Sequence, residues 1–425
     1  MKTAGLKKFL HHNLEIILLS LIPSTLYFKE NVNAYFLLAF LFYWLYQRKY
    51  RNIDQSLLKG LRLYLLFAVL YITGICVGNL FTSDIASATN FLFKQLTLLA
   101  FPVVLSHIQW TEKNKQIFNG IFVGATVVFL TYLWFQVILR IVDTGSLYMV
   151  DPLHPTWKYY HFTSGRLSPE VHPTFLSLYL TYCLFYLGSQ VGKTGTFLRK
   201  AVLYMVMLLF LINLLLLSSR GALLSLLLVF VGHELIKAVL DKSKASLARL
   251  FLTGLVVVLI FSGTSVFKRI SKISNYFDRP LVEIANIDNS SGNRAQIYLI
   301  AGKIIEDNFW LGIGSKNWGT SSKEYYNRYF REDFDYNIDS LNTHNQFLNS
   351  WVSWGFFGLI FLGGVVLCPI YISYRAGNAE DCKFLFFFLF VLLTENILDR
   401  HRGIIFFSLI SSYIMIHAFG RSSDG

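Results

Sequence analysis

Charged residues are scarce in this sequence of 425 residues. Asp, Glu, Lys and Arg together make up 15% of it, whereas 54% of it is hydrophobic. Soluble domains carry about 25% charged residues. So little charge in so apolar a chain, whose mean hydropathy is +0.48, argues against a soluble enzyme and predicts an integral membrane protein.

Cysteine and the familiar cofactor motifs are also missing or rare. The four cysteines, Cys76, Cys183, Cys368 and Cys382, fall in or beside apolar runs, so we expect no disulfide framework in an exported loop. The sequence has no Walker loop, dinucleotide fingerprint, HExxH or CxxC pair. The densest acidic run, Glu332 to Asp335, has the composition of a solvated loop. We therefore expect no cofactor and no metal site.

Basic residues outnumber acidic ones, and the net charge is +13. The Lys and Arg residues are scattered through short loops instead of following one face, which argues against a nucleic-acid partner. Acidic residues are almost absent from the interiors of the apolar runs, so a proton- or cation-coupled transporter would lack its usual relay.

Apolar runs long enough to cross a membrane dominate the chain. The sequence predicts an all-α, polytopic membrane protein with about twelve transmembrane helices, at residues 13–28, 32–47, 61–81, 91–109, 117–140, 171–189, 199–218, 221–240, 248–264, 347–373, 383–397 and 403–419. The first run could instead be a signal peptide. We expect helices one to nine in residues 1–264, a large periplasmic loop with short helices at 265–343, and helices ten to twelve in residues 344–425.

The short loops indicate the orientation. Lys and Arg concentrate in the loops after the second, fourth, sixth, eighth and tenth spans, whereas the alternate short loops 29–31 and 82–90 contain only Lys29. Cytoplasmic loops are the ones enriched in Lys and Arg. Both termini are therefore predicted to be cytoplasmic, with membrane lipids around the spans.

Three arginines contradict this bias. Arg220 lies in a very short external turn, and Arg400 and Arg402 lie in another. Each is either an anchor at the membrane surface or a contact for an anionic ligand. For Arg400 and Arg402 a further reading is pairing with Glu395 and Asp399.

Two external loops are long and rich in aromatic residues, at about 142–170 and 265–343. Aromatic rings among amides and carboxylates suit sugar binding, although such a loop can also pack its own small core. Within the second loop, a helix is predicted to begin near Ser291 and end before Gly312. Arg294 lies in its first turn, where the helix dipole disfavours a cation, so it is either a surface residue or part of an anion site.

The segment from Thr343 to Gly358 carries the strongest motif. His344 and Asn345 stand between the long polar loop and an apolar helix, a costly position for a histidine that is neither paired nor used. Gly355 follows after nine residues and Gly358 after two more, a spacing that predicts close approach of another helix.

This motif resembles the signature of the O-antigen ligase and O-antigen polymerase superfamily of bacterial membrane glycosyltransferases, which are GT-C-like. The Arg220-Gly221 pair at a span boundary and Arg294 at the start of a loop helix also look like family elements. The resemblance is closest to O-antigen ligase. It implies transfer of a glycan from undecaprenyl diphosphate to an acceptor hydroxyl, with lipid A core as the acceptor, at a periplasmic site of the bacterial inner membrane.

The resemblance also implies roles for individual residues. His344 would accept the proton of the acceptor hydroxyl, while Arg220 and Arg294 would hold the diphosphate without a metal ion, in an inverting displacement. Expected substrate-binding residues are Arg166, His172, Asn345, Arg400 and Arg402. The motif leaves open an O-antigen polymerase or a protein O-oligosaccharyltransferase. A lipid-linked glycan flippase and a non-catalytic scaffold are the alternatives from other classes.

Overall fold

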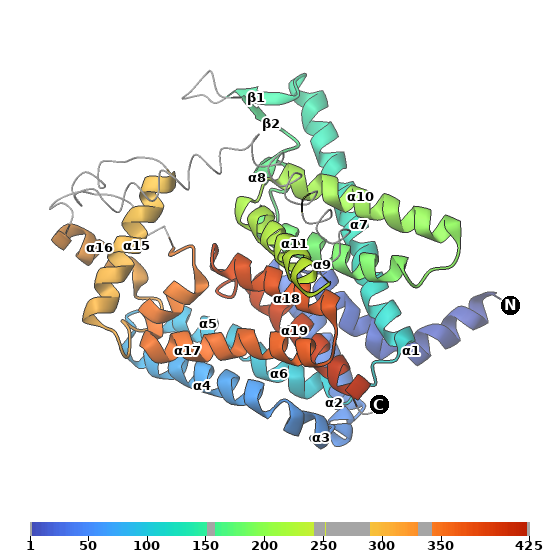
Figure 1. Cartoon of the computed structure of the whole chain (residues 1–425), viewed down its shortest axis with the longest axis horizontal. Helices are drawn as coiled ribbons and strands as arrows, with labels where there is room; N and C mark the ends of the chain where they lie inside the picture. The colour runs from blue at the N-terminus through green and yellow to red at the C-terminus, as the bar shows by residue number, and fades with distance from the viewer. Residues whose placement is uncertain (1, 151–157, 242–250, 252–289, 330–341, 423–425) are drawn as a thin grey trace.

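The structure, a computed structural model, describes residues 2–150, 158–241, 251, 290–329 and 342–422 (Figure 1). Within these residues the chain is almost entirely helical. The longer helices are α1 (Lys2–Ser24), α2 (Glu30–Tyr46), α4 (Arg62–Gly78), α5 (Ile85–Gln95), α6 (Thr97–Leu105), α7 (Glu112–Thr144), α9 (Pro173–Val191), α10 (Phe197–Leu217), α11 (Arg220–Asp241), α15 (Ser290–Asp307), α16 (Trp318–Tyr329), α17 (Gln346–Arg375), α18 (Ala379–Leu392) and α19 (His401–Ser422). Shorter elements are η1 (Lys49–Asn52), α3 (Gln55–Gly60), η2 (Asn79–Phe81) and α8 (Ser164–Leu167).

Seven stretches of the described chain are long and apolar enough to cross a membrane. They are Arg62–Phe81, Ile85–Leu105, Glu112–Thr144, Phe197–Leu217, Arg220–Leu240, Gln346–Arg375 and His401–Phe419. This supports the predicted all-α membrane protein, whereas the number twelve stays a prediction. Helices lie at every predicted run outside 248–264, and nearly all of that run falls outside the described residues.

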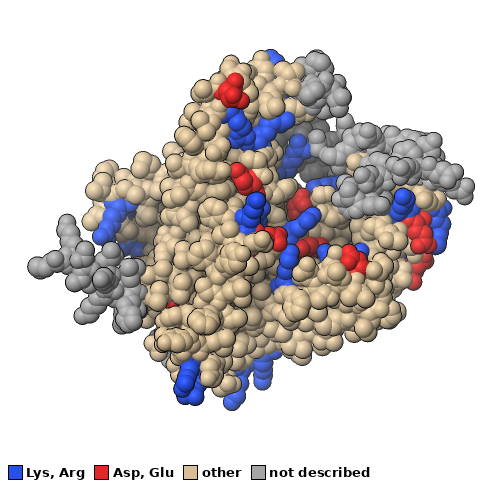
Figure 2. All heavy atoms as spheres, turned by 180° about the vertical axis from the view of Figure 1, so that it is seen from behind, with Lys and Arg blue, Asp and Glu red and all other residues tan. Residues whose placement is uncertain are grey.

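Helix α19 forms the centre of the bundle. Its span His401–Phe419 is 89% buried, and side chains from α1, α4, α7, α9, α17 and α18 complete the same core. Peripheral helices instead expose apolar side chains, such as Phe42 of α2 (71% exposed) and Met205 of α10 (66%). Figure 2 shows a broad surface nearly free of ionised side chains, with Lys and Arg at its margin and both signs of charge gathered in a hollow above it. Such a surface suits contact with lipid.

The predicted loop at 142–170 contains a short antiparallel hairpin, β1 (Tyr148–Val150) paired with β2 (Lys158–Tyr160), followed by α8. Its prolines Pro152 and Pro155 lie outside the described residues. Most of the second loop, including Glu332 to Asp335, also lies outside them, but α15 and α16 lie side by side near the beginning of α17 (Figure 1). The helix predicted around Arg294 is confirmed as α15.

Helix α17 is kinked at Gly355, which has a φ of +68°. The kink exposes main-chain groups to the loop after α15: the N–H groups of Ile313 and Gly314 donate to the carbonyls of Val352 and Ser353, both at 2.9 Å. A Cβ at position 355 would collide with the Trp310 backbone. The prediction that the glycines admit another helix is therefore wrong for Gly355, because an irregular loop makes the close approach.

Candidate functional site

The beginning of α17 fixes the position of His344. Asn345 is the N-cap of the helix, and its side-chain oxygen accepts the N–H groups of Phe347 at 3.0 Å and Leu348 at 3.1 Å. His344 precedes it with a φ of +46°, a left-handed conformation that costs a non-glycine residue about 1 kcal/mol. The Asn342 side chain accepts the His344 N–H at 2.9 Å, which helps to hold this conformation.

The loop between α18 and α19 is clamped onto this segment. Thr343 and Asn396 are hydrogen-bonded through their side chains at 3.1 Å. Gln346 accepts the N–H of Leu398 at 2.8 Å and donates to Asp399 at 2.8 Å. Thr343 and Gln346 are fully buried. Because buried hydrogen bonds are costly to break, they fix the loop and bring Glu395 to His344.

His344, Glu395 and Arg294 form one cluster, called here the His344 cluster. The Nδ1 atom of His344 lies 3.1 Å from Oε2 of Glu395, and a guanidinium nitrogen of Arg294 lies 3.5 Å from Oε1 of the same carboxylate. The side chains are 28%, 22% and 35% exposed, respectively. The cluster is therefore accessible to a substrate.

An ionised Glu395 determines which ring nitrogen of a neutral His344 carries the proton. Burial alone would raise the pKa of Glu395, but the hydrogen bond from His344 and the charges of His344 and Arg294 lower it below its usual value. An ionised carboxylate accepts the Nδ1 proton, which leaves Nε2 of a neutral His344 with a lone pair. Among the described residues, Nε2 has no hydrogen-bond partner, so it is placed to accept a proton from a ligand.

Helix α15 brings Arg294 into the cluster. Its residues Ile300, Ala301 and Ile304 form a small apolar core with Tyr326 of α16 and Val352 of α17. This core is separate from that of the bundle. It anchors the second half of α15 against α16 and α17, and thereby holds the helix that carries Arg294 near α17.

Arg220 and His172 reach the same end of the bundle from two other helices. Arg220 begins α11, and the next residue, Gly221, packs so closely on Thr394 that a Cβ would collide with its hydroxyl. The hydroxyls of Ser219 and Thr174 are hydrogen-bonded at 3.2 Å. Thr174 lies two residues after His172, which caps α9. Four segments distant in the sequence therefore converge around Glu395 and its neighbour Thr394.

His172 is electrostatically coupled to the His344 cluster. Burial lowers the pKa of His172 below its usual value, the negative charge of Glu395 opposes this, and the positive charges of His344 and Arg400 add to it. The charges of Glu395 and His344 therefore act on the pKa of His172 in opposite directions.

The other predicted substrate-binding residues have different contacts. Asn345 is the helix cap, and within the described residues the Arg166 guanidinium stacks on the Tyr159 ring at 4.1 Å. Arg402 donates to the main-chain oxygens of Glu170 at 2.7 Å and Phe28 at 2.8 Å, and Arg400 is exposed. The reading that Glu395 and Asp399 pair with Arg400 and Arg402 is wrong for Glu395, which pairs with His344 and Arg294.

Glu395 is the residue that the sequence reasoning missed. It lies 51 residues after His344 in the chain and belongs to no local motif. The sequence gives one indication that Glu395 has a partner: an acidic residue at the end of an apolar run is energetically costly unless it is paired.

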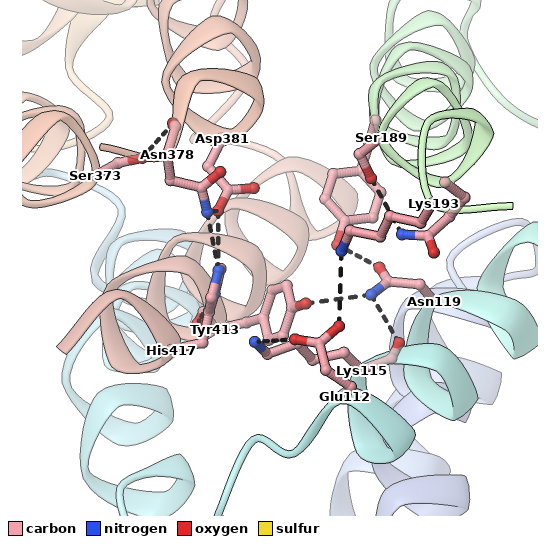
Figure 3. A network of polar contacts seen from close by, with 12 residues as sticks. Glu112, Lys115, Asn119, Ser189, Lys193, Ser373, Asn378, Asp381, Tyr413 and His417 are labelled. Atoms are coloured by element: carbon pink, nitrogen blue, oxygen red, sulfur yellow. Dashed lines mark hydrogen bonds and ion pairs between the residues drawn. The ribbon is translucent and has the colours of Figure 1, made fainter. Parts of the chain in front are cut away.

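A second histidine–carboxylate pair lies at the opposite ends of α17 and α18 (Figure 3). Nε2 of His417 lies 3.1 Å from Asp381, and Asn378 and Tyr413 contact the same ring. Asn119 links this group to Tyr182 and Tyr413 through hydrogen bonds of 2.6 and 3.2 Å. These residues are called here the His417 cluster, and they border a cavity of about 200 Å³.

Within the described part of the chain, no three His, Cys, Asp or Glu side chains are grouped as metal ligands. The cationic side chain of the His344 cluster is Arg294, and the planar guanidinium of an arginine binds phosphate oxygens in pairs. The arrangement combines an imidazole, a carboxylate in contact with one of its ring nitrogens, and a guanidinium beside the same carboxylate.

The comparisons with known proteins agree with the predicted resemblance. Residues 205–363 match the family described as O-antigen ligase. The matched region contains Arg220, Arg294 and the complete motif from His344 to Gly358. No curated protein matches the chain.

Proposed function

We propose that this chain, which matches the O-antigen ligase family over residues 205–363, is a glycosyltransferase that moves a glycan from undecaprenyl diphosphate to an acceptor hydroxyl. The observation that carries the proposal is the His344 cluster, in which a partly exposed imidazole and the Arg294 guanidinium contact the same carboxylate, while Nε2 of the imidazole has no hydrogen-bond partner among the described residues. We further propose that the acceptor is the core of lipid A, so that the reaction is the ligation of O-antigen in lipopolysaccharide assembly.

The proposed reaction is one inverting displacement. The Nε2 atom of His344 takes the proton of the acceptor hydroxyl, whose oxygen forms a bond to the anomeric carbon of the donor. The bond from that carbon to the diphosphate oxygen breaks, and the electron pair leaves with the diphosphate. General-base catalysis of this kind contributes about 10²–10⁴-fold.

Arg294 and Arg220 serve the leaving group in this proposal. Positive charge that is fixed before the reaction stabilises negative charge that develops in the transition state. Glu395 positions two components at once, because it contacts both His344 and Arg294. It holds His344 in the tautomer whose Nε2 is free, and it stabilises the imidazolium formed by proton transfer.

We place the reaction at the outer face of the bacterial inner membrane, with both termini in the cytoplasm. Support comes from the Lys and Arg bias of the short loops and from the position of the His344 cluster at one end of α17 and α18. Donor and acceptor are both lipid-linked, so they would reach such a site by diffusing in the membrane.

Lipopolysaccharide from cells that lack the gene tests the function. Loss of a ligase leaves core without polymer, whereas loss of a polymerase leaves core carrying a single repeat. Normal lipopolysaccharide together with an unglycosylated surface protein would instead indicate a protein O-oligosaccharyltransferase. Normal lipopolysaccharide and normal protein glycosylation would contradict the whole proposal.

Transfer is also expected to be independent of metal ions, because arginines take the place of a cation at the diphosphate. Purified protein with lipid-linked donor should keep its rate in excess EDTA. Loss of activity that magnesium restores would contradict this, and Glu332 to Asp335 would be the first residues to replace.

A further inference from the structure

A cavity of about 270 Å³ lies beside the His344 cluster and is not explained by the roles given above. Two of its lining residues connect it to the cluster. Asn342 accepts the main-chain N–H of His344, and Asn396 is the neighbour of Glu395. A molecule in this cavity would therefore lie next to the proposed base.

Asp399 is the acidic group of the cavity. Its oxygens accept hydrogen bonds from the amides of Gln346 and Asn349, both at 2.8 Å, and of Asn396 at 3.4 Å. A carboxylate has about four acceptor sites, so these three donors leave room for one more. Asp399 is a built acceptor for a ligand hydroxyl.

Aromatic and cationic side chains complete the lining. Phe91 and Trp318 contribute rings, and the ammonium of Lys316 lies 4.6 Å from the centre of the Phe91 ring. Arg400 lines the cavity as well, and it is exposed. Rings that pack on a sugar face, together with donors and acceptors for its hydroxyls, form a carbohydrate site.

The size of the cavity limits the ligand. Sites for drug-sized ligands measure about 300–1,000 Å³, so 270 Å³ suits one sugar ring. Neither Arg220 nor Arg294 lines it. The side chains proposed to hold the diphosphate are therefore not those that line the cavity. The ligand of the cavity would then be distinct from the diphosphate of the donor.

We propose that this cavity binds one pyranose ring of the acceptor and presents its hydroxyl to Nε2 of His344. Asp399 and Lys316 are acceptor-binding residues in this assignment, which rests on the proposed glycosyltransferase function. A neutral or acidic sugar fits two cations and one carboxylate better than an amino sugar with a free ammonium group.

Steady-state kinetics with purified protein in detergent test the assignment. The donor is lipid-linked glycan from the same bacterium, and the acceptor is core-only lipopolysaccharide from cells lacking the gene. Asp399→Asn and Lys316→Met should each raise the KM for acceptor about 10- to 100-fold, the value of a lost hydrogen bond to a charged group. The KM for donor should stay unchanged. Glu306→Gln, at an exposed α15 carboxylate paired with Lys303, is the matched control and should change neither.

Two kinetic outcomes would overturn the assignment. An increase only in the KM for donor would show that the cavity holds a donor sugar, and unchanged constants in both variants would show that it holds none. Melting temperatures identify a variant that is merely unfolded. Hydrogen exchange of the wild type is the independent test of acceptor binding. Core-only lipopolysaccharide should protect the amides of residues 315–319 and 396–400, and absence of this protection would overturn the assignment of the cavity. Failure of the wild type to transfer glycan would instead count against the proposed function.

Discussion

The His344 and His417 clusters have the same central contact and opposite surroundings. In each, a histidine nitrogen lies 3.1 Å from a carboxylate oxygen. The His344 side chain is 28% exposed, and one ring nitrogen has no partner among the described residues. The His417 side chain is 4% exposed, and both of its ring nitrogens are engaged, by Tyr413, Asn378 and Asp381. A histidine–carboxylate pair therefore indicates chemistry only where a ring nitrogen is left for a substrate.

The two clusters also differ in how they are built. The His417 cluster closes the junction of α17 and α18 against α19, with Asn378 hydrogen-bonded to Asp381 in the first turn of α18. The His344 cluster instead joins α17 to α15 and to the loop before α19. We infer that the His417 cluster stabilises the bundle and that the His344 cluster holds a reactive group.

Replacing the two histidines should give the largest contrast. His344→Ala should lower transfer about 10²–10⁴-fold because the general base is lost, with little change in melting temperature. His417→Ala should lower the melting temperature because buried polar partners are left unpaired, while the folded protein keeps its rate. Rates per folded molecule and melting in detergent measure both. Normal transfer in His344→Ala would remove the histidine from the mechanism.

Replacing the two carboxylates should give a smaller contrast of the same kind. Glu395→Gln puts an amide beside Nδ1, which can donate to that atom and force the proton onto Nε2. A lost hydrogen bond to a charged group is worth about 1.5–3 kcal/mol, so transfer should fall about 10- to 100-fold. Asp381→Asn should leave the rate of folded protein unchanged. Equal losses in the two variants would show that the clusters do not differ in function.

Replacing the two proposed diphosphate-binding arginines with lysine tests the contact to the leaving group. Arg294→Lys and Arg220→Lys keep the charge but lose the planar fork, and each should lower transfer about tenfold and weaken donor binding, at the low end for a charged hydrogen bond. The control is Arg328→Lys on α16, an exposed residue paired with Glu324 at 2.7 Å, which should transfer normally. Arginine variants with normal donor binding would count against a diphosphate contact.

Sequence patterns were sufficient for the helices but not for the site. Long apolar runs predicted where helices lie, and the cap signal before Arg294 predicted α15, because both depend on neighbouring residues. The placement of His344, Arg220 and Arg294 marked them as unusual, but only a family motif assigned them to one site. Glu395 and the cavity around Asp399 could not be predicted, because the clamp between Thr343 and Asn396 and the burial of Gln346 are contacts between distant segments. The kink at Gly355 was misread because the spacing of glycines does not tell which segment approaches.

The smallest expected effect concerns His172, which has no counterpart in the His417 cluster. Its pKa is lowered by burial, so between its usual value near 6.5 and the lower folded value the unfolded chain binds a proton that the folded chain does not. Stability is therefore complete above pH 6.5 and decreases as the pH falls through this window. His172→Asn keeps a good helix cap and removes the titration. Its melting temperature should fall less than that of the wild type between pH 7.5 and 5.5, and identical slopes would show that His172 is not coupled to folding. Any change in the KM for donor in the same variant would be a separate result, since a merely structural cap would not alter it.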